Sequence, residues 1–249
     1  MKRAFFTLCM IAFAAVAAAQ SSYVESVIDM RMVWVDGGTF MMGAAVEQND
    51  AHYNEKPAHQ VAVDGYWIAA TEVTQAQWKA VMGSNPSTFK GEDNPVDNVS
   101  WRDAQTFCEK LSRMTGKRYA LPTEAQWEYA ARGGNKSKGT KYSGSSKADM
   151  VAWHDGNSDN TSHPVAQKRP NELGLYDMSG NLYEWCCDRY APYTSAPQTN
   201  PTGAASGDYY TLRGGSWHYA EQTCRITDRI NDLPQCVNDY YGLRIVCLP

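Results

Sequence analysis

Asn171-Glu172-Leu173-Gly174-Leu175-Tyr176-Asp177-Met178-Ser179-Gly180-Asn181-Leu182-Tyr183-Glu184 is the most informative stretch of this 249-residue chain. Two carboxylates in it, Asp177 and Glu184, flank a glycine turn whose main-chain carbonyls can point inward. Carboxylate and carbonyl oxygens held by a tight turn suit a hard cation such as Ca²⁺. The spacing is not that of an EF-hand loop. On spacing alone, an Asp-capped turn followed by an edge strand is therefore the stronger interpretation.

Composition places the chain among ordinary globular proteins. Hydrophobic residues make up 43% and charged residues 20%, which excludes a disordered chain, a collagen-like chain and a long coiled coil. The formal net charge of -4 provides no basic field, so we expect no nucleic-acid partner. Eight Trp and fifteen Tyr indicate a loop-rich domain with large rings buried among polar connections.

The first nineteen residues have the pattern of a secretory signal peptide. Lys2 and Arg3 precede an uncharged apolar run at 4–16, and three small residues end at Ala19. We therefore expect a signal peptide over residues 1–19 and an exported protein, periplasmic, cell-surface or secreted. The apolar run is too short for a membrane span, and no second one follows. The cysteines that remain number six, which favours disulfides in an exported chain: Cys108, Cys186, Cys187, Cys224, Cys236 and Cys247.

Strand patterns dominate the start of the mature chain. Residues 20–31 are expected to form a loose N-terminal lead. Apolar runs at 32–35 and 39–43 flank Asp36-Gly37-Gly38, which is a hairpin signal. A second strand pair is expected within residues 59–70, broken at Asp64-Gly65.

Three helices carry clear start and stop signals. Thr74, Ser100 and Thr123 are N-cap residues that predict helices over 75–82, 101–114 and 124–132, each ended by glycine. The second helix is expected to bury one face, consisting of Ala104, Phe107, Cys108 and Leu111. Residues 134–249 hold only short runs between turn residues. The chain therefore reads as one α+β domain over residues 32–249 with low regular secondary structure.

Two local patterns resemble reactive sites. Gly214-Gly215-Ser216 resembles the turn that carries a catalytic nucleophile, but no helix pattern follows it. We therefore favour a close approach of two backbone segments beside a buried Trp217. Cys186 and Cys187 are adjacent, and neighbouring cysteines rarely bond each other because the geometry is strained. Each is expected to have a different partner.

Many motifs in one order now give a family resemblance. The chain resembles the formylglycine-generating enzyme family, also called the sulfatase-modifying-factor family, over nearly its full mature length. The resemblance makes residues 32–249 a sulfatase-modifying-factor-like domain and implies a C-type-lectin-like fold of the formylglycine-generating-enzyme type. Besides the opening stretch, the matching segments are Gly37-Gly38-Thr39-Phe40-Met41-Met42-Gly43, Glu55-Lys56-Pro57-Ala58-His59, Thr71-Glu72-Val73-Thr74-Gln75-Ala76-Gln77-Trp78, Pro95-Val96, Asn98-Val99-Ser100-Trp101, Leu121-Pro122-Thr123-Glu124-Ala125-Gln126-Trp127-Glu128-Tyr129, Arg213-Gly214-Gly215-Ser216-Trp217 and Gly242-Leu243-Arg244.

The resemblance implies a calcium site and argues against a copper site. The family's calcium turn maps onto Asp177, Gly180, Leu182 and Glu184. The enzyme oxidises a sulfatase cysteine with copper held by Cys-x-x-x-x-Cys, and those two positions here are Tyr219 and Cys224. A phenol cannot replace a soft thiolate, so we do not expect copper. Tyr183 also stands where the enzyme has Trp. If the chain were active, Cys224 and Ser216 would be the catalytic candidates.

The resemblance also implies disulfide pairs. Similarity to family members that look noncatalytic pairs Cys186 with Cys224, and similarity to the enzyme pairs Cys108 with Cys247. The partners of Cys187 and Cys236 stay unassigned.

Two functions follow. The first is an exported noncatalytic module that binds a protein or glycan ligand, because polar surfaces lined by rings suit such ligands. Its binding face would lie near the family's substrate face and consist of Trp217, His218, Tyr219, Gln222, Tyr240 and Tyr241. The alternative is a formylglycine-generating oxidase, or a related oxidoreductase, that acts on a protein cysteine and uses Cys224 differently.

Overall fold

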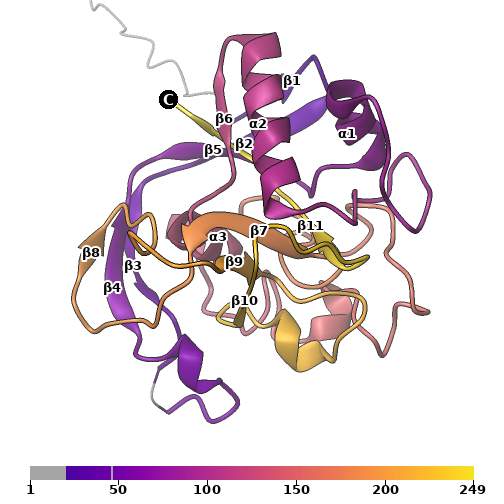
Figure 1. Ribbon diagram of the computed structural model, residues 1–249. Coiled ribbons are helices and arrows are strands. Elements are labelled where there is room, and N and C mark those ends of the chain that lie inside the picture. The colour runs from indigo at the N-terminus through magenta and orange to yellow at the C-terminus, as the bar shows by residue number, and fades with distance from the viewer. Residues whose placement is uncertain (1–20, 46) are drawn as a thin grey trace, which may run out of the picture.

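A computed structural model describes residues 21–45 and 47–249. The expected signal peptide at 1–19 lies outside these residues. The described strands form three sheets of five, four and three strands (Figure 1). The α-helices of the described residues all end by Ala131. Residues 134–249 contain short strands and 3-10 turns, as the sequence predicted.

The five-stranded sheet joins the two ends of the described chain. Its order is β1-β2-β5-β12-β6, and all neighbours are antiparallel. The expected loose lead at 20–31 is wrong, because residues 22–25 pair with β2 as an edge strand. The strands are β1 (Ser22–Glu25), β2 (Met30–Val35), β5 (Tyr66–Ala69), β12 (Val246–Leu248) and β6 (Arg118–Ala120).

The two smaller sheets lie below it in Figure 1. The three-stranded sheet has the order β3-β4-β8, and the four-stranded sheet has the order β10-β9-β7-β11. Strand β7 lies between β9 and β11, so the expected edge strand after the glycine turn is a central strand. The bounds are β3 (Gly38–Met42), β4 (His59–Val63), β8 (Gln198–Thr199), β7 (Tyr183–Arg189), β9 (Tyr210–Arg213), β10 (Arg229–Asp232) and β11 (Tyr241–Gly242).

The two expected hairpins are wrong in their pairing. Strand β2 pairs with β5, and β3 pairs with β4, so the chain crosses between two sheets at both Gly-containing turns. A Cβ at Gly37 would lie 2.8 Å from the Val63 carbonyl, and one at Gly65 would lie 2.5 Å from the Trp34 ring. The glycines therefore let one long ribbon bend at the crossing, rather than reverse the chain.

The three helices begin where the sequence signals place them and end within one residue of the predicted ends, although Arg132 rather than a glycine caps the third. Helix α1 (Gln75–Met82), α2 (Trp101–Thr115) and α3 (Glu124–Ala131) each start at a reciprocal capping box. Gly83 and Gly116 end the first two in the left-handed conformation. Helix α2 packs beside α1 and against β6 at the top of Figure 1.

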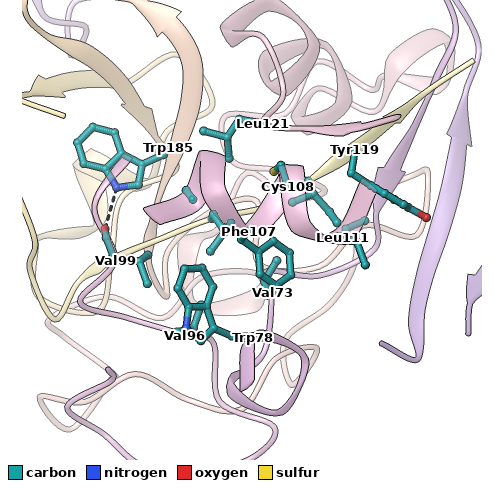
Figure 2. Packing of buried hydrophobic residues seen from close by; sticks show 14 of the residues in the cluster. Val73, Trp78, Val96, Val99, Phe107, Cys108, Leu111, Tyr119, Leu121 and Trp185 are labelled. Carbon is teal, nitrogen blue, oxygen red and sulfur yellow. Dashed lines mark hydrogen bonds between the residues drawn. The ribbon is translucent and has the colours of Figure 1, made fainter. Parts of the chain in front are cut away.

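The largest hydrophobic cluster lies between α1, α2 and the strands. Figure 2 shows the buried face of α2, with Phe107 stacked against Trp78 at 5.2 Å between ring centroids. The indole of Trp185 donates to the Val99 carbonyl at 3.0 Å. This expected face is confirmed: its four residues are at most 1% exposed. The core therefore fixes β7, which continues from the glycine turn.

Candidate functional site

The turn from Asp177 to Glu184 packs in the interior. Asp177, Gly180 and Asn181 all have positive φ, at 57°, 78° and 65°. A Cβ at Gly180 would collide with the main chain of Trp153, so only glycine fits there. The Gly180 amide donates to the Gly214 carbonyl at 2.8 Å. The turn predicted from sequence is confirmed, and it is held from several sides.

Glu184, one of the four expected calcium ligands, is engaged by protein groups. Its carboxylate accepts from Arg244 Nη2 at 2.8 Å and Nε at 3.0 Å, and from Trp127 Nε1 at 2.6 Å. All three side chains are fully buried. A carboxylate with this many charge-assisted and neutral donors has little free capacity for a cation.

Asp177, the other carboxylate, does have free capacity. One oxygen accepts from the Ala166 amide at 2.7 Å, while the other is buried without a hydrogen-bond partner. Burial raises the pKa of Asp177 to about 6, and the Glu184 carboxylate adds to the increase. Glu72 lies beside the turn and accepts from the Leu182 amide at 2.9 Å. Burial, then repulsion by Asp177 and Glu184, raises its pKa strongly.

These contacts support one of the two predicted calcium-binding carboxylates more than the other. Three buried carboxylates face one arginine, and Asp177 offers an unpaired oxygen, so a cation would relieve repulsion there. Glu184 could coordinate the same ion only by giving up part of its contact with Arg244. The structure therefore brings the four predicted positions into one turn, with Asp177 the side chain that fits a cation best.

The second candidate region is the Gly-Gly-Ser segment and Cys224. A Cβ at Gly215 would lie 2.7 Å from the Thr223 carbonyl and 2.8 Å from the Cys224 Cα, so the predicted close backbone approach is confirmed. Ser216 is fully buried, and its hydroxyl accepts from the His218 amide at 3.4 Å. Cys224 is also fully buried, and burial raises the pKa of its thiol to about 12. Neither side chain presents a reactive group at the surface.

The expected binding face divides into exposed and buried rings. His218, Tyr219 and Gln222 are exposed, Tyr219 by 38%, and Tyr240 is half-buried. Trp217 and Tyr241 are each only 5% exposed, so they lie on the buried side of this group, as the Gly-Gly segment already indicated for Trp217. They pack beneath the other rings because the indole of Trp217 donates to the Asp239 carbonyl and the Tyr241 hydroxyl donates to Asp232, both at 3.1 Å.

His218, Tyr219 and Tyr240 form one ring surface, here called the ring face. The His218 and Tyr240 rings stack, with centroids 5.2 Å apart and an interplanar angle of 11°. Tyr219 stands perpendicular to both, at 5.0 Å and 5.3 Å. The two hydroxyls lie 3.4 Å apart. Two segments 21 residues apart in sequence thus meet in one aromatic surface.

Four arginines that sequence reasoning missed are paired inside the protein. Arg213, Arg225, Arg229 and Arg244 are fully buried, and each contacts a buried glutamate. The partners are Glu128, Glu55, Glu124 and Glu184 respectively. The only signal in the sequence that could have indicated these buried arginines is their position within strand-like or motif segments. These pairs bind the loops of the second half to α3, β7 and the segment around Glu55.

The disulfide pairs expected from the resemblance are absent from the described residues. All six cysteines there are free thiols, so the predictions of Cys186–Cys224 and Cys108–Cys247 are not met. Cys186 and Cys224 belong to separate core clusters. Cys108 and Cys247 share a cluster without a bond. Cys187 instead donates to Asp188 at 3.2 Å. In the described residues, buried ion pairs hold the loops where covalent links were expected.

The architecture of small mixed sheets, three helices and long loops is the C-type-lectin-like fold of the formylglycine-generating-enzyme type. A family model for the sulfatase-modifying factor enzyme 1-like domain matches residues 19–248. The chain belongs to this family.

Three relatives show the range of proteins to which the chain is similar. It is 32% identical to the chaperone protein LppX of Paenibacillus barcinonensis, over 91% of this chain and 92% of that protein. It is 33% identical to the formylglycine-generating enzyme of Streptomyces coelicolor, over 72% of this chain but only 60% of the enzyme. The solved structure of Treponema denticola variable protein 1 superposes with a TM-score of 0.83 at 31% identity, covering 94% of this chain and all of that one. Shared family membership thus does not decide between catalysis and binding. None of the helices in the described part of the chain has the length and apolar character of a membrane span.

Proposed function

We propose that the chain is an exported, noncatalytic module that binds a protein ligand through the ring face. One observation carries this proposal. Tyr219, at the position that the resemblance assigns to the first copper cysteine, is a partly exposed member of a three-ring surface. The position that supplies a metal ligand in the enzyme would therefore supply surface for ligand contact in this chain.

The surroundings of Cys224 support a noncatalytic role. Copper binding and nucleophilic chemistry both use the thiolate rather than the thiol. Cys224 is fully buried, and its raised pKa keeps the proton on sulfur at neutral pH. The charges that raise this pKa after burial are the carboxylates of Asp228, Asp155 and Glu221. A negative environment disfavours a thiolate further.

The ring face has the properties of a recognition surface. Tyrosine and histidine rings combine apolar area with a polar edge, and aromatic residues are enriched at protein interfaces. Their mutual stacking, together with the buried Trp217 and Tyr241 beneath them, restricts the rotamers before a ligand arrives. Less conformational entropy is then lost on binding. A protein ligand is favoured over a glycan because the Tyr219 and Tyr240 hydroxyls pair with each other at 3.4 Å and so have less capacity for sugar hydroxyls.

We also propose that Ca²⁺ binds at the turn formed by Asp177, Gly180, Leu182 and Glu184. The buried, unpaired oxygen of Asp177 supports this proposal. When bound, the ion would supply positive charge to a cluster of buried carboxylates. Its role is structural, since the turn leads into the central strand β7.

A displayed library of random dodecapeptides tests the binding function. The library is selected in parallel on the wild type, on a His218→Ala/Tyr219→Ala/Tyr240→Ala variant, and on a matched Tyr53→Ala/Tyr209→Ala control. Tyr53 and Tyr209 are exposed rings elsewhere, at 90% and 48%. We expect peptides that are enriched on the wild type and the control but not on the triple variant. If all three equally stable proteins select the same peptides, or none, the ring face is not a binding site.

A further inference from the structure

Four acidic residues, here called the rim, lie on the segments that carry or adjoin the ring face. The Asp155 amide donates to the Tyr219 carbonyl at 3.1 Å, and Glu221 begins the 3-10 turn that follows Ala220. Asp239 precedes Tyr240 in the chain, and Asp232 accepts from the Tyr241 hydroxyl. Every segment that positions an exposed ring therefore also carries an acid: Asp155, Glu221, Asp232 and Asp239.

Two of these acids, Asp239 and Asp232, act electrostatically on the Tyr240 hydroxyl. Burial raises the pKa of Tyr240, the neighbouring Tyr219 hydroxyl raises it further, and Asp239 and Asp232 add to the increase. Asp155 and Glu221 act in the same way on the buried thiol of Cys224. Two cations lie on adjoining segments. Lys90 acts on Asp97, which also faces Asp239, and the Arg102 amide donates to the Pro234 carbonyl. On these segments, the four acids named above outnumber the two bases.

We infer that the ring face binds a cationic peptide segment, with an arginine or lysine side chain lying on the exposed rings and the four acids compensating its charge. This inference rests on the proposed function and names its ligand chemistry. A guanidinium stacks on an aromatic face and is attracted by the ring quadrupole. Carboxylates at the rim steer such a segment toward the surface and exclude acidic partners. The formal charge of the whole chain, -4, has the same sign as the rim.

Peptides of fixed spacing test the charge preference. Acetylated (Gly-Arg)₄, (Gly-Gln)₄ and (Gly-Glu)₄ are titrated into the full chain at low and high salt. We expect (Gly-Arg)₄ to bind at least about tenfold more tightly than (Gly-Gln)₄ at low salt, with the difference shrinking as salt screens the rim. (Gly-Glu)₄ should not bind.

Variants then separate the charge from the rings. Glu221→Gln with Asp239→Asn removes two rim charges while keeping side-chain size, and we expect (Gly-Arg)₄ to bind about fivefold to tenfold more weakly. Asp155 stays unchanged, because it also lies 3.6 Å from His154 Nδ1. Glu109→Gln with Asp64→Asn, on α2 and at the β4–β5 turn, is the matched control. It should bind like the wild type.

The outcomes distinguish this inference from the function on which it rests. Library peptides that require the three rings but are neutral or acidic would show that the ligand is not cationic. Ring-dependent binding of a neutral oligosaccharide alone would show the same. In both cases a binding site at the ring face remains. Equal binding of (Gly-Arg)₄ to the wild type and to the rim variant also overturns the cationic ligand. If no ligand depends on the three rings, the proposed function itself fails.

Discussion

Replacing Glu55 by Gln should destabilise the protein strongly, although the change is nearly isosteric. Glu55 is fully buried and accepts from Arg225 Nη1 at 2.6 Å and Nη2 at 2.7 Å, from the Thr227 hydroxyl at 2.6 Å and from the His52 amide at 2.7 Å. Burial alone would raise the pKa of Glu55. The bonds from Arg225, Thr227 and the His52 amide outweigh it and hold the pKa below its usual value.

The size of the effect follows from what the substitution leaves behind. Removing one partner of a buried ion pair costs about 3–5 kcal/mol, because the other charge stays buried without compensation. Asp228, 3.4 Å from Arg225 Nη2, retains part of the compensation, so we expect about 3 kcal/mol. At about 2–4 °C per kcal/mol for a domain of this size, Tm falls by about 6–12 °C.

Thermal unfolding followed by circular dichroism at neutral pH measures this shift. Glu109→Gln is the control, because Glu109 and Arg113 form an exposed pair at 3.6 Å whose loss should leave Tm within about 1–2 °C of the wild type. A Glu55→Leu/Arg225→Met variant removes both charges and should recover part of the loss. If Glu55→Gln melts like Glu109→Gln, the buried pair does not hold these loops together.

Three further results follow from the described residues. Burial, then repulsion by Glu124, raises the pKa of Asp188 from 3.8 to about 7. Between those pH values the folded state keeps a proton that the unfolded state releases, so the wild-type free energy of unfolding falls as pH rises. Asp188→Asn should therefore be more stable than the wild type at pH 8, by up to about 4 kcal/mol, and lose the advantage near pH 4; equal unfolding free energies at pH 8 would count against the shift. In a thiol-labelling time course without reductant, the half-buried Cys236 and Cys187 should react before the four buried cysteines of the described residues. Unfolding should expose all six of these thiols, and a smaller total would reveal a disulfide. Ca²⁺ should raise Tm in the wild type but not in Asp177→Ala, and a wild-type Tm indifferent to both Ca²⁺ and chelator would argue against the ion.

Local signals in the sequence predicted the helices, whereas strand pairing needed information that lies far apart in the chain. A capping box involves residues three apart, so Thr74 and Thr123 indicated their helices directly. The turns at Gly37 and Gly65 look like hairpin turns in isolation. They act as bends because β2 pairs with β5 and β3 pairs with β4. A short stretch of sequence cannot reveal this pairing, because the partners lie far apart in the chain.

The interior was harder to predict because its charged residues violate the usual burial preference. Arginine is almost never fully buried unless it is paired, and the partners here are distant: Glu55 and Arg225 are 170 residues apart. An even cysteine count in a chain expected to be exported favoured disulfides, yet the described cysteines are free thiols. The segment from Asp177 to Glu184 was located correctly as a turn, but the contact between Glu184 and Arg244 was not foreseeable from spacing.

The ring face was predicted in part. The resemblance pointed to the two segments that form it, and His218, Tyr219 and Tyr240 do meet there. Which rings are exposed depends on hydrogen bonds to the interior, such as the one from Trp217 to the Asp239 carbonyl. A sequence pattern rich in aromatic residues cannot separate the contact rings from those that support them.

An aldehyde-formation assay decides most directly between a binding module and an oxidase. Reduced protein is incubated with Cu(I), oxygen and a Cys-x-Pro-x-Arg peptide, and mass spectrometry follows conversion of the peptide cysteine to formylglycine. Tyr219 stands at the position that the resemblance assigns to the first copper cysteine, and Cys224 is buried as a thiol, so we expect no conversion by the wild type, nor by a Cys224→Ser variant. Turnover by the wild type that disappears in Cys224→Ser would contradict the proposed function and show that the chain is an enzyme.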